Sequence, residues 1–505
     1  MTVGDLLLKS AQQTPEKEAL VYNDTRLTYA ELATRVQRLA GGLRDLGLQH
    51  GDRVGLLLYN SHHAYETLLA TALSGLVFVP LNFMLNSREL ATIAAHADVR
   101  AIVTEPELYP SIAPVLADLP SLQHLIGLGD IENATADLAT LTQEGQAQSF
   151  PVSETDLFGL MYTSGTTGLP KGVMLSHANI VAHAHHMVRD YKISHSSRGF
   201  IILPYFVGAA LNGIGFPCIS QGGTVVIQRR FTPEDFLHTI AAEHITHVQV
   251  VPTLIVRLLE SAALQDSDTS SLQVFGYGSA PMPVDRLKEA LHRIGPIFAQ
   301  MYGLTETCAM AVCLQQEEHS LHSPQVERLA SCGRPVQNVE VRIVDEQGDE
   351  VPIGTVGEVV IRGPTVMQGY WNLPEVTAES IKNGWFHSGD LAYRDAEGYI
   401  FLTDRKKDVI ITGGFNVYPK EIEEVLYTHA AVFECAVIGV PDPEWGEAIK
   451  AVVAPRPGVE VSTAELLDFC RAHLTRFKCP KFVDFVEEIP RNPSGKVLKR
   501  LLRQQ

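Results

Sequence analysis

The sequence has few cysteines and few basic residues, and each shortage excludes a class of protein. Seven cysteines are spread over 505 residues without a CxxC pair, which argues against a disulfide framework or a structural zinc site and indicates a reducing, cytoplasmic location. Lys and Arg number 40 against 58 Asp and Glu, for a formal charge of −18. Because so acidic a surface repels phosphate backbones and anionic lipid, nucleic acid is excluded as the principal partner.

Long apolar segments are missing as well. Residues Met1–Ala19 lack a basic run followed by an apolar core, so we expect no signal peptide. The most apolar stretch, Leu68–Leu85, contains Gly75, Pro80 and Asn82, and a buried helix that runs into a strand fits it better than a transmembrane segment. With 45% apolar and 19% charged residues, the composition is typical of a globular protein, and the length predicts at least two domains.

Helix and strand signals alternate over most of the first 300 residues. Thr28 and Glu31 form a T-x-x-E capping box that opens a helix, and Gly47 is its predicted end. Alternation of this kind predicts parallel sheets covered by helices. The pattern also predicts helices at 62–75 and 87–97, and strands at Val54–Leu58, 76–81, 100–104, Gly199–Leu203, Thr224–Ile227, His247–Val251 and Val274–Tyr277.

After about residue 330 the pattern changes to short strands separated by Gly and Asp turns, as in a small barrel or an antiparallel sheet. The sharpest charge cluster, DRKKD at 404–408, precedes a compact α+β pattern that includes a predicted strand at Ala436–Val440 and a predicted helix at Thr463–His473. We therefore predict an α/β protein. It would have a large N-terminal domain of parallel sheets packed with helices plus a small barrel (1–403), a hinge (404–408) and a C-terminal α+β domain (409–505).

The strongest local signal is the string YTSGTTGLPKG at 162–172. Its small hydroxyl residues and glycines allow backbone N–H groups and hydroxyls to approach phosphates closely, and its lysine adds a cation. It is not a Walker A loop, because Pro170 and not Gly precedes the lysine. The predicted phosphate-binding residues are Thr163, Ser164, Gly165, Thr166, Thr167, Gly168 and Lys171.

Seven motifs follow one another along the chain: YTSGTTGLPKG (162–172), YGSAPM (277–282), QMYGLTET (300–307), GWFHSGD (384–390), DRKKD (404–408), GGFNVYP (413–419) and PRNPSGK (490–496). In this order they resemble the motifs of the adenylate-forming superfamily, which includes acyl-CoA synthetases, firefly luciferases and peptide-synthetase adenylation domains. The acyl-CoA synthetases, fatty-acid–CoA ligases among them, are the group that the chain resembles most. The resemblance covers nearly the whole chain and implies ATP, Mg²⁺ and coenzyme A as cofactors.

The chemistry that this resemblance implies explains the residue types. Joining a carboxylate to the α-phosphate of ATP brings two anions together, so positioning and charge neutralisation dominate, without a protein nucleophile. Glu306 would hold Mg²⁺ with Thr166 as a second ligand, and Thr305 would donate to the α-phosphate. Adenine would stack on Tyr302. Small neighbours would let the nucleotide and acyl chain pass beside the backbone: Gly278, Ser279, Ala280 and Gly303.

The resemblance also assigns roles near the predicted hinge. Asp390 would accept both ribose hydroxyls, with Arg405 as its partner on ribose and phosphate. Lys407 stands at the hinge position, where a charged residue stays solvated while its dihedral angles change. These roles imply that the C-terminal domain is mobile and alternates between adenylation and thioester formation.

Two further motifs would act in different orientations of that domain. Lys496 would enter the site as the adenylation lysine and pair with both reacting anions. Gly413 and Gly414 would line the pantetheine tunnel once the small domain has rotated.

The acyl pocket is the least defined part of the site. Members of the superfamily often carry Pro-x-x-His where this chain reads Pro204-Tyr-Phe-Val207, and amino-acid-activating members carry Phe-Asp. Val207 lacks both the gating imidazole and a partner for an ammonium group, and Gly208 and its neighbours are small. We therefore expect a medium- or long-chain fatty acid, with an aryl acid as the alternative.

Three functions remain open from the sequence. An acyl-CoA synthetase is favoured by the motifs, followed by a stand-alone adenylating enzyme that loads a carrier protein and by a non-catalytic nucleotide-binding protein. The expected partners are a small carboxylic acid, ATP and CoA, and the oligomeric state stays open, a homodimer included. A histidine-rich helix does not predict a metal site, because no carboxylate or cysteine lies among its histidines: His177, His183, His185 and His186.

Overall fold

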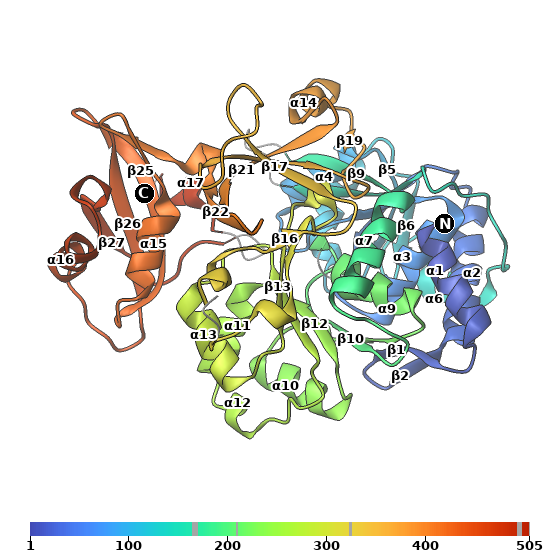
Figure 1. The fold of residues 1–505 in the computed structure, drawn as a ribbon. Coiled ribbons are helices and arrows are strands. Elements are labelled where there is room, and N and C mark those ends of the chain that lie inside the picture. Colours follow the sequence, from blue (N-terminus) through green and yellow to red (C-terminus); the bar gives the residue numbers. More distant parts are fainter. Residues whose placement is uncertain (164–169, 209–210, 323–325, 492–496, 504–505) are drawn as a thin grey trace.

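Two large sheets, two smaller sheets and the helices between them make up the molecule (Figure 1). The computed structural model describes residues 1–163, 170–208, 211–322, 326–491 and 497–503. The predicted loop residues 164–168 and Lys496 lie outside these ranges. Within them, no helix is long and apolar enough to cross a membrane.

The first large sheet has eight strands in the order β19-β9-β8-β4-β3-β5-β6-β7. The strands from β8 to β7 run parallel and β9 and β19 are antiparallel additions at one edge, so the alternating pattern predicted this region correctly. The strand bounds are β3 Arg53–Leu57, β4 Val77–Pro80, β5 Val99–Thr104, β6 His124–Gly127, β7 Ala136–Asp137, β8 Leu157–Thr163, β9 Lys171–Ser176 and β19 Gly369–Tyr370.

The second large sheet has nine strands in the order β16-β15-β14-β13-β12-β10-β11-β1-β2. Its centre, from β14 to β1, is parallel, and antiparallel pairs close both edges. The strand bounds are β1 Glu18–Tyr22, β2 Thr25–Thr28, β10 Arg198–Ile201, β11 Thr224–Ile227, β12 His247–Val250, β13 Val274–Gly278, β14 Phe298–Tyr302, β15 Val312–Leu314 and β16 Arg334–Pro335.

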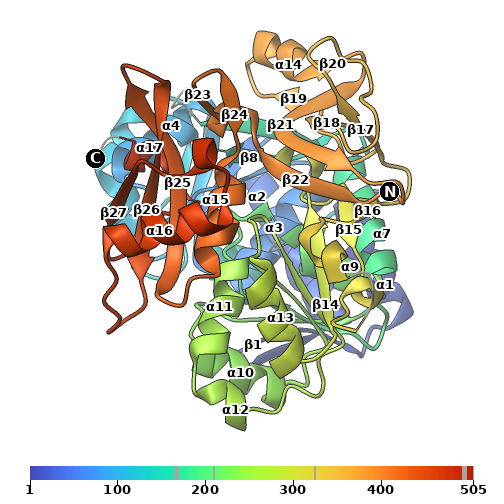
Figure 2. The same ribbon diagram turned by 60° about the vertical axis from the view of Figure 1, so that its left-hand side comes forward.

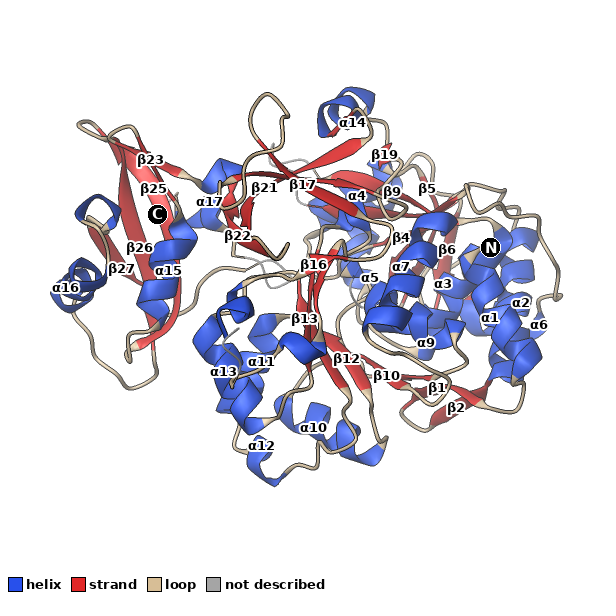
Figure 3. Cartoon of the chain, in the orientation of Figure 1, coloured by secondary structure: helices blue, strands red, loops and turns tan. Residues whose placement is uncertain are grey.

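Helices cover these sheets, and the interface between the two sheets is part of one large apolar core (Figure 3). The predicted capping box is present, since the Thr28 side chain and Glu31 exchange hydrogen bonds with each other's backbone N–H groups at the start of α2. The α-helices of this part are α1 Val3–Gln13, α2 Tyr29–Asp45, α3 His62–Ser74, α4 Ser87–His96, α5 Tyr109–Ile112, α6 Leu138–Glu144, α7 His177–Asp190, α9 Phe216–Ser220, α10 Pro233–Ala242, α11 Pro252–Glu260, α12 Ala263–Asp266 and α13 Val284–Arg293.

Single turns of other helical types interrupt the loops. One of them, η2 at Leu211–Gly215, is a π-helical turn that follows the predicted acyl-pocket segment, and π-helical turns are frequent at functional sites. The others are 3₁₀ turns: η1 Ala113–Asp118, η3 Thr305–Thr307, η4 Gln316–Glu318, η5 Val326–Ala330, η6 Lys406–Asp408 and η7 Arg476–Lys478.

The third sheet is antiparallel, in the order β17-β18-β21-β20 with β22 on β21. Of the two forms expected after residue 330, the described strand pairings show the antiparallel sheet. A helix, α14 (Pro374–Ser380), accompanies it. Its strands are β17 Glu340–Val344, β18 Gly357–Arg362, β20 Ile381–Lys382, β21 Trp385–Arg394 and β22 Ile400–Arg405.

The C-terminal sheet has its own apolar cores, one on each face. Helices α15 (Pro419–Tyr427) and α16 (Thr463–His473) pack on one face, and α17 (Lys499–Leu502) contributes to the other, so the sheet forms a separate layer in Figures 1 and 2. The α+β pattern predicted for this part is confirmed. Its strands are β23 Ile410–Thr412, β24 Phe415–Val417, β25 Val432–Asp442, β26 Gly446–Pro455 and β27 Phe482–Phe485.

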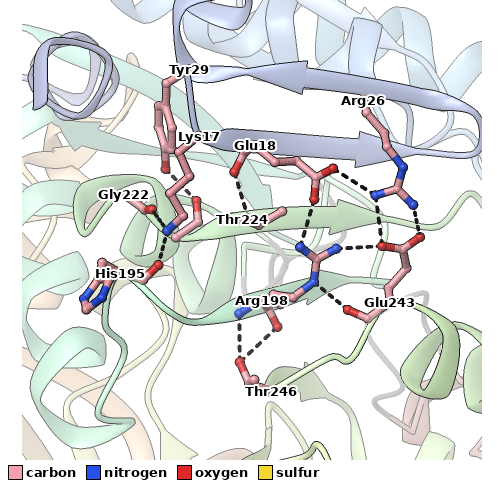
Figure 4. Close-up of polar contacts among 11 residues, drawn as sticks. Lys17, Glu18, Arg26, Tyr29, His195, Arg198, Gly222, Thr224, Glu243 and Thr246 are labelled. Atoms are coloured by element: carbon pink, nitrogen blue, oxygen red, sulfur yellow. Dashed lines mark hydrogen bonds and ion pairs between the residues drawn. The ribbon is translucent and has the colours of Figure 1, made fainter. Parts of the chain in front are cut away.

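Within the second large sheet, a charged network links the β1–β2 hairpin to β10 (Figure 4). Arg198 bonds Glu18 at 2.8 Å and Glu243 at 2.6 Å, and Arg26 bonds the same two carboxylates. Burial opposes ionisation of Glu18, but hydrogen bonds from Arg198 and Arg26 hold its pKa below the ordinary value. This contribution to stability is therefore present above the ordinary pKa of Glu and is lost as the pH falls below it.

Replacing Arg198 by Ala is expected to lower the free energy of unfolding by about 1–3 kcal/mol, because two partly buried carboxylates lose a partner. The side chain of Arg198 is 24% exposed, whereas that of Arg26 is 49% exposed. Arg26→Ala is therefore the matched control, with an expected loss of about 0–1 kcal/mol. Thermal melting at pH 7 compares the two, and an equal shift for both variants would contradict the expectation.

Candidate active site

The predicted phosphate loop connects two adjacent strands of the first large sheet. Thr163 ends β8 and Lys171 begins β9, and the two residues are cross-strand partners. The loop between them leaves from the carboxyl end of a parallel strand, the edge at which open α/β sheets bind ligands. The structure therefore places the first and last of the predicted loop residues side by side.

Glu306 lies in η3, and its carboxylate is held by a residue that the motifs did not single out. The Tyr370 hydroxyl donates to Glu306 Oε1 at 2.9 Å, and both side chains are buried. Lys171 Nζ lies 5.1 Å from the centroid of the Tyr370 ring, within the range of a cation–π interaction. We call Glu306, Tyr370 and Lys171 the phosphate cluster.

Tyr370 reaches this position through the sheet. It is in β19, which pairs with β9, so that Tyr370 lies opposite Val173, two residues after Lys171. Burial, and then the Glu306 carboxylate, raise the pKa of Tyr370, so the hydroxyl stays protonated and remains a donor. A tyrosine 64 residues from its partner has no local sequence signal.

The backbone around Glu306 is strained and closely packed. Cys308 and Ala309 follow η3 with φ angles of 54° and 83°, in the left-handed region that costs a non-glycine residue energy. Gly303 precedes it, and a Cβ there would lie 2.6 Å from the Ala309 carbonyl oxygen. Thr305 is half-buried in the same turn. The turn thus requires Gly303 and fixes the direction of the Glu306 side chain.

The small residues predicted to line the nucleotide site lie at the carboxyl end of β13 and directly after it. A Cβ at Gly278 would lie 2.4 Å from the Met301 carbonyl oxygen, so glycine is required there. Ser279 is exposed and has a φ of 70°, and Ala280 follows it, half-buried. Because β13 and β14 are parallel neighbours, these residues lie beside Tyr302, the last residue of β14.

Asp390 lies between a tyrosine and an arginine. Tyr302 donates its hydroxyl to Asp390 Oδ2 at 2.9 Å, and Arg405 Nε lies 3.0 Å from Asp390 Oδ1. Ser388 adds a third contact, since its Oγ accepts from the Asp390 backbone N–H at 3.0 Å. Burial, and then the Asp390 charge, raise the pKa of Tyr302, which stays a donor. We call Tyr302, Asp390 and Arg405 the nucleoside cluster.

The nucleoside cluster joins sequence-distant segments as the motifs predicted, but Tyr302 contributes differently. Its ring is predicted to stack on adenine, and its hydroxyl also orients the predicted ribose carboxylate of Asp390. Asp390 and Arg405 are cross-strand partners on β21 and β22. One antiparallel strand pair therefore fixes the geometry of their ion pair.

Lys407 belongs to the predicted hinge, and Gly413 and Gly414 belong to the C-terminal sheet. Lys407 is exposed in η6, directly after Arg405 and Lys406. Gly413 and Gly414 form the β23–β24 turn with φ angles of 57° and 83°, and a Cβ at Gly413 would lie 2.6 Å from Trp445 Cε3. The contacts of this turn are thus within the C-terminal sheet.

The predicted acyl residues follow β10, whose carboxyl end lies at the same sheet edge as those of the parallel strands β12, β13 and β14. Val207 is 6% exposed and donates its backbone N–H to the Pro204 carbonyl at 2.8 Å. A Cβ at Gly208 would lie 3.8 Å from Met161 Cε and 3.9 Å from Asn212 Nδ2, which is ordinary contact. Gly208 therefore borders space that a small group can enter.

The donor set of the phosphate cluster fits Mg²⁺. Glu306 offers a buried carboxylate in a fixed orientation next to a lysine, and Mg²⁺ prefers one or two protein oxygens completed by substrate phosphates. Among the described residues, three potential metal ligands of the His, Cys, Asp and Glu type gather at His62, His63 and Glu66. Glu66 is already bonded there by Arg35, so this group is a buried ion pair with neighbouring histidines.

Comparison with known proteins agrees with the observed fold. Residues 7–371 match the AMP-binding enzyme family and residues 421–496 match the AMP-binding enzyme C-terminal domain. Feruloyl-CoA synthase of Amycolatopsis sp. is 39% identical over 100% of this chain and 99% of its own length. Fatty acid–[acyl-carrier-protein] ligase ScoC of Streptomyces coeruleorubidus is 37% identical over 98% of this chain and 94% of its own length.

Solved structures agree with these matches. The crystal structure of ATP-bound MatB from Rhodopseudomonas palustris superimposes with a TM-score of 0.90 at 32% identity, covering 100% of this chain and 99% of that one. The fold is that of an adenylate-forming enzyme. The chain belongs to the AMP-binding enzyme family, whose members use ATP, Mg²⁺ and CoA, and the predicted class of AMP-forming acid–thiol ligases is confirmed.

Tyr370→Phe is expected to weaken the use of magnesium–ATP while leaving the fold intact. The variant keeps the ring beneath Lys171 but removes the hydroxyl that donates to Glu306, so the carboxylate loses its fixed orientation at a cost of about 1–3 kcal/mol. A magnesium titration of ATP–pyrophosphate exchange should show a higher half-saturating concentration. Tyr393→Phe, which keeps its ring stacked on Phe401 near the turn between β21 and β22, is the control, and equal titrations for the two variants would contradict the role.

Proposed function

We propose that the chain activates a carboxylic acid with ATP to form acyl-AMP and pyrophosphate, then transfers the acyl group to CoA and releases AMP. The observation that carries this proposal is the spacing of the two clusters. Tyr302 of the nucleoside cluster and Glu306 of the phosphate cluster belong to one short segment at the end of β14. A single nucleotide can therefore place its ribose on one cluster and its phosphates on the other.

The residues of both clusters suit a reaction between two anions. Asp390 and Arg405 would hold the ribose, while Lys171 and the hydroxyls of Thr163 and Thr305 would bind phosphate oxygens. Each of these groups neutralises or orients charge, and the acid itself supplies the nucleophilic oxygen. Positioning and charge stabilisation then account for catalysis.

Glu306 would hold the Mg²⁺ ion of magnesium–ATP, together with Thr166 from the loop outside the described residues. When bound, the ion supplies neutralisation of the phosphate charge. The chain's own contribution is orientation, because Tyr370 holds the carboxylate and the strained turn after η3 fixes its backbone. Gly278, Ser279, Ala280 and Gly303 would leave room for the nucleotide beside them.

We propose that residues 404–408 are the hinge between a domain at 1–403 and a mobile domain at 409–505. Support comes from the separate apolar cores of the C-terminal sheet and from the exposure of Lys407. Lys496 would serve adenylation in one orientation, and Gly413 and Gly414 would line the pantetheine path in the other. Arg405 lies within the hinge and pairs with Asp390 across strands β21 and β22.

For the acid, we propose an aryl acid and keep the medium- or long-chain fatty acid of the sequence analysis as the competing class. The buried side chain of Val207 offers no partner for a charged group on the far part of the acid. Aryl acids and fatty acids carry no charge there, so both classes fit this position. The relative named feruloyl-CoA synthase is the more similar of the two relatives described above, 39% against 37% identical for the fatty-acid ligase. Shape and polarity of the pocket would then decide the acid.

A panel of carboxylic acids tests the function. Each acid is incubated with ATP, Mg²⁺ and either CoA or a phosphopantetheinylated carrier protein, and release of AMP and formation of thioester are followed. The expected result is AMP release coupled to acyl-CoA with aryl acids. Thioester on the carrier alone would move the function to carrier loading, and no ATP–pyrophosphate exchange with any acid would reject it.

A further inference from the structure

A group of buried polar side chains lies behind the predicted acyl residues, and neither cluster uses it. It comprises His183 on α7, Asn212 on the π-helical turn η2, and Gln249 near the carboxyl end of β12. All three are at most 4% exposed. A pocket for a plain hydrocarbon tail has no need of such groups.

His183 is the least satisfied of them. Both imidazole nitrogens are buried, and neither makes a side-chain hydrogen bond of normal geometry to any residue that the structure describes. The Asn212 backbone is a polar neighbour of the ring. Burial lowers the pKa of His183 to about 3, with the Asn212 backbone opposing the shift, so the ring is neutral at pH 7. A neutral imidazole offers one N–H donor and one nitrogen acceptor. Buried polar groups in folded proteins are almost always paired, so an imidazole without a hydrogen bond of normal geometry calls for a partner.

Asn212 connects this histidine to the acyl residues. Its Nδ2 lies 3.9 Å from the position that a Cβ would occupy at Gly208, and its backbone is the polar neighbour of His183. A π-helical turn places an extra residue in one turn, which redirects side chains and is frequent at functional sites. The turn thus brings an amide to the border of the predicted acyl pocket.

Gln249 is accommodated by two glycines. A Cβ at Gly276 would lie 2.2 Å from Gln249 Oε1, and one at Gly213 would lie 3.1 Å from its Cγ. Tyr191 donates to Gln249 Oε1 at 2.7 Å, which fixes the amide. Any larger residue at Gly276 would displace the Gln249 side chain. The absence of a side chain at Gly276 therefore leaves room for a buried polar group.

We infer that the acid bound by this enzyme carries an oxygen substituent away from its carboxylate, as in a hydroxylated aromatic acid, and that His183 and Asn212 recognise that oxygen. The inference rests on the proposed function and adds the substrate class. A phenolic hydroxyl can donate to one imidazole nitrogen or accept from the other, whereas a bare ring or an alkyl chain leaves both unpaired. Sites that hydrogen-bond a substrate hydroxyl reject the analogue that lacks it far more strongly than apolar pockets discriminate size.

The test compares acids that differ by one hydroxyl: 4-hydroxycinnamic acid, cinnamic acid and octanoic acid, with acyl-CoA formation as the readout. The wild-type enzyme should prefer the hydroxylated acid by at least about tenfold in kcat/KM. His183→Leu should reduce that preference toward unity by slowing the hydroxylated acid alone. His185→Leu, on the exposed face of the same helix, should leave the preference unchanged.

The outcomes separate this inference from the proposed function. Equal or better use of cinnamic or octanoic acid by the wild-type enzyme overturns the inference while leaving the ligase activity established. Failure of all acids to give acyl-CoA overturns the proposed function itself. If His183→Leu fails to fold, the inference is tested by the wild-type preference and by Asn212→Leu. An unchanged preference for the hydroxylated acid in Asn212→Leu overturns the assignment to these residues.

Discussion

Lys496→Ala is expected to abolish acyl-adenylate formation and to leave thioester formation from a supplied acyl-adenylate largely intact. The lysine belongs to PRNPSGK, outside the described residues, and would face the site in only one of two domain orientations. In that orientation it would pair with both reacting anions, so its loss should cost at least about 10²–10³ in the first half-reaction. In the other orientation it would be far from the thiol.

The two half-reactions are measured separately. ATP–pyrophosphate exchange reports adenylation, and consumption of a synthetic acyl-adenylate with CoA reports thioester formation. Arg500→Ala removes an exposed cation four residues further along and serves as the matched control. Equal loss of both half-reactions in Lys496→Ala would contradict domain alternation and indicate a general loss of structure.

Elements with strong local signals were predicted closely. The helix that follows the Thr28–Glu31 capping box and the helix Thr463–His473 form as expected, because caps and the spacing of apolar residues act within a few turns. Strand ends in the C-terminal sheet were less accurate. Strand β25 covers Val432–Asp442, well beyond the predicted Ala436–Val440, because its length is set by pairing with β26 and not by local sequence.

The candidate site shows the same division between local and long-range information. Motifs identified Asp390, Arg405 and Glu306, because each stands in a short characteristic string. The tyrosine hydroxyls that orient them were missed, since Tyr302 and Asp390 are 88 residues apart and only the fold brings them to 2.9 Å. The sequence predicted no metal site at His183, because no carboxylate or cysteine lies near it. That its imidazole is buried without a hydrogen bond of normal geometry to a described residue is visible only in the structure.

Glu306→Gln is expected to reduce adenylation by a factor on the order of 10²–10³ at ordinary magnesium concentrations, while the melting temperature changes little. The amide is isosteric with the carboxylate, and its oxygen can still accept the Tyr370 hydroxyl, so the buried hydrogen bond survives. What is lost is the negative charge that Mg²⁺ requires of its ligand.

The decisive measurement is a magnesium titration with a readout that does not depend on turnover. Magnesium–ATP should raise the melting temperature of the wild-type protein, because a ligand that binds the folded state alone stabilises it, and the shift should shrink in Glu306→Gln. Glu379→Gln removes an exposed carboxylate on α14 and should keep the full shift. Tyr370→Phe perturbs the orientation of Glu306 but not its charge. Its shift in melting temperature should therefore lie between those of Glu306→Gln and the wild-type protein. A full shift in Glu306→Gln would mean that the metal is held without this carboxylate, and the phosphate cluster would then lose its assignment.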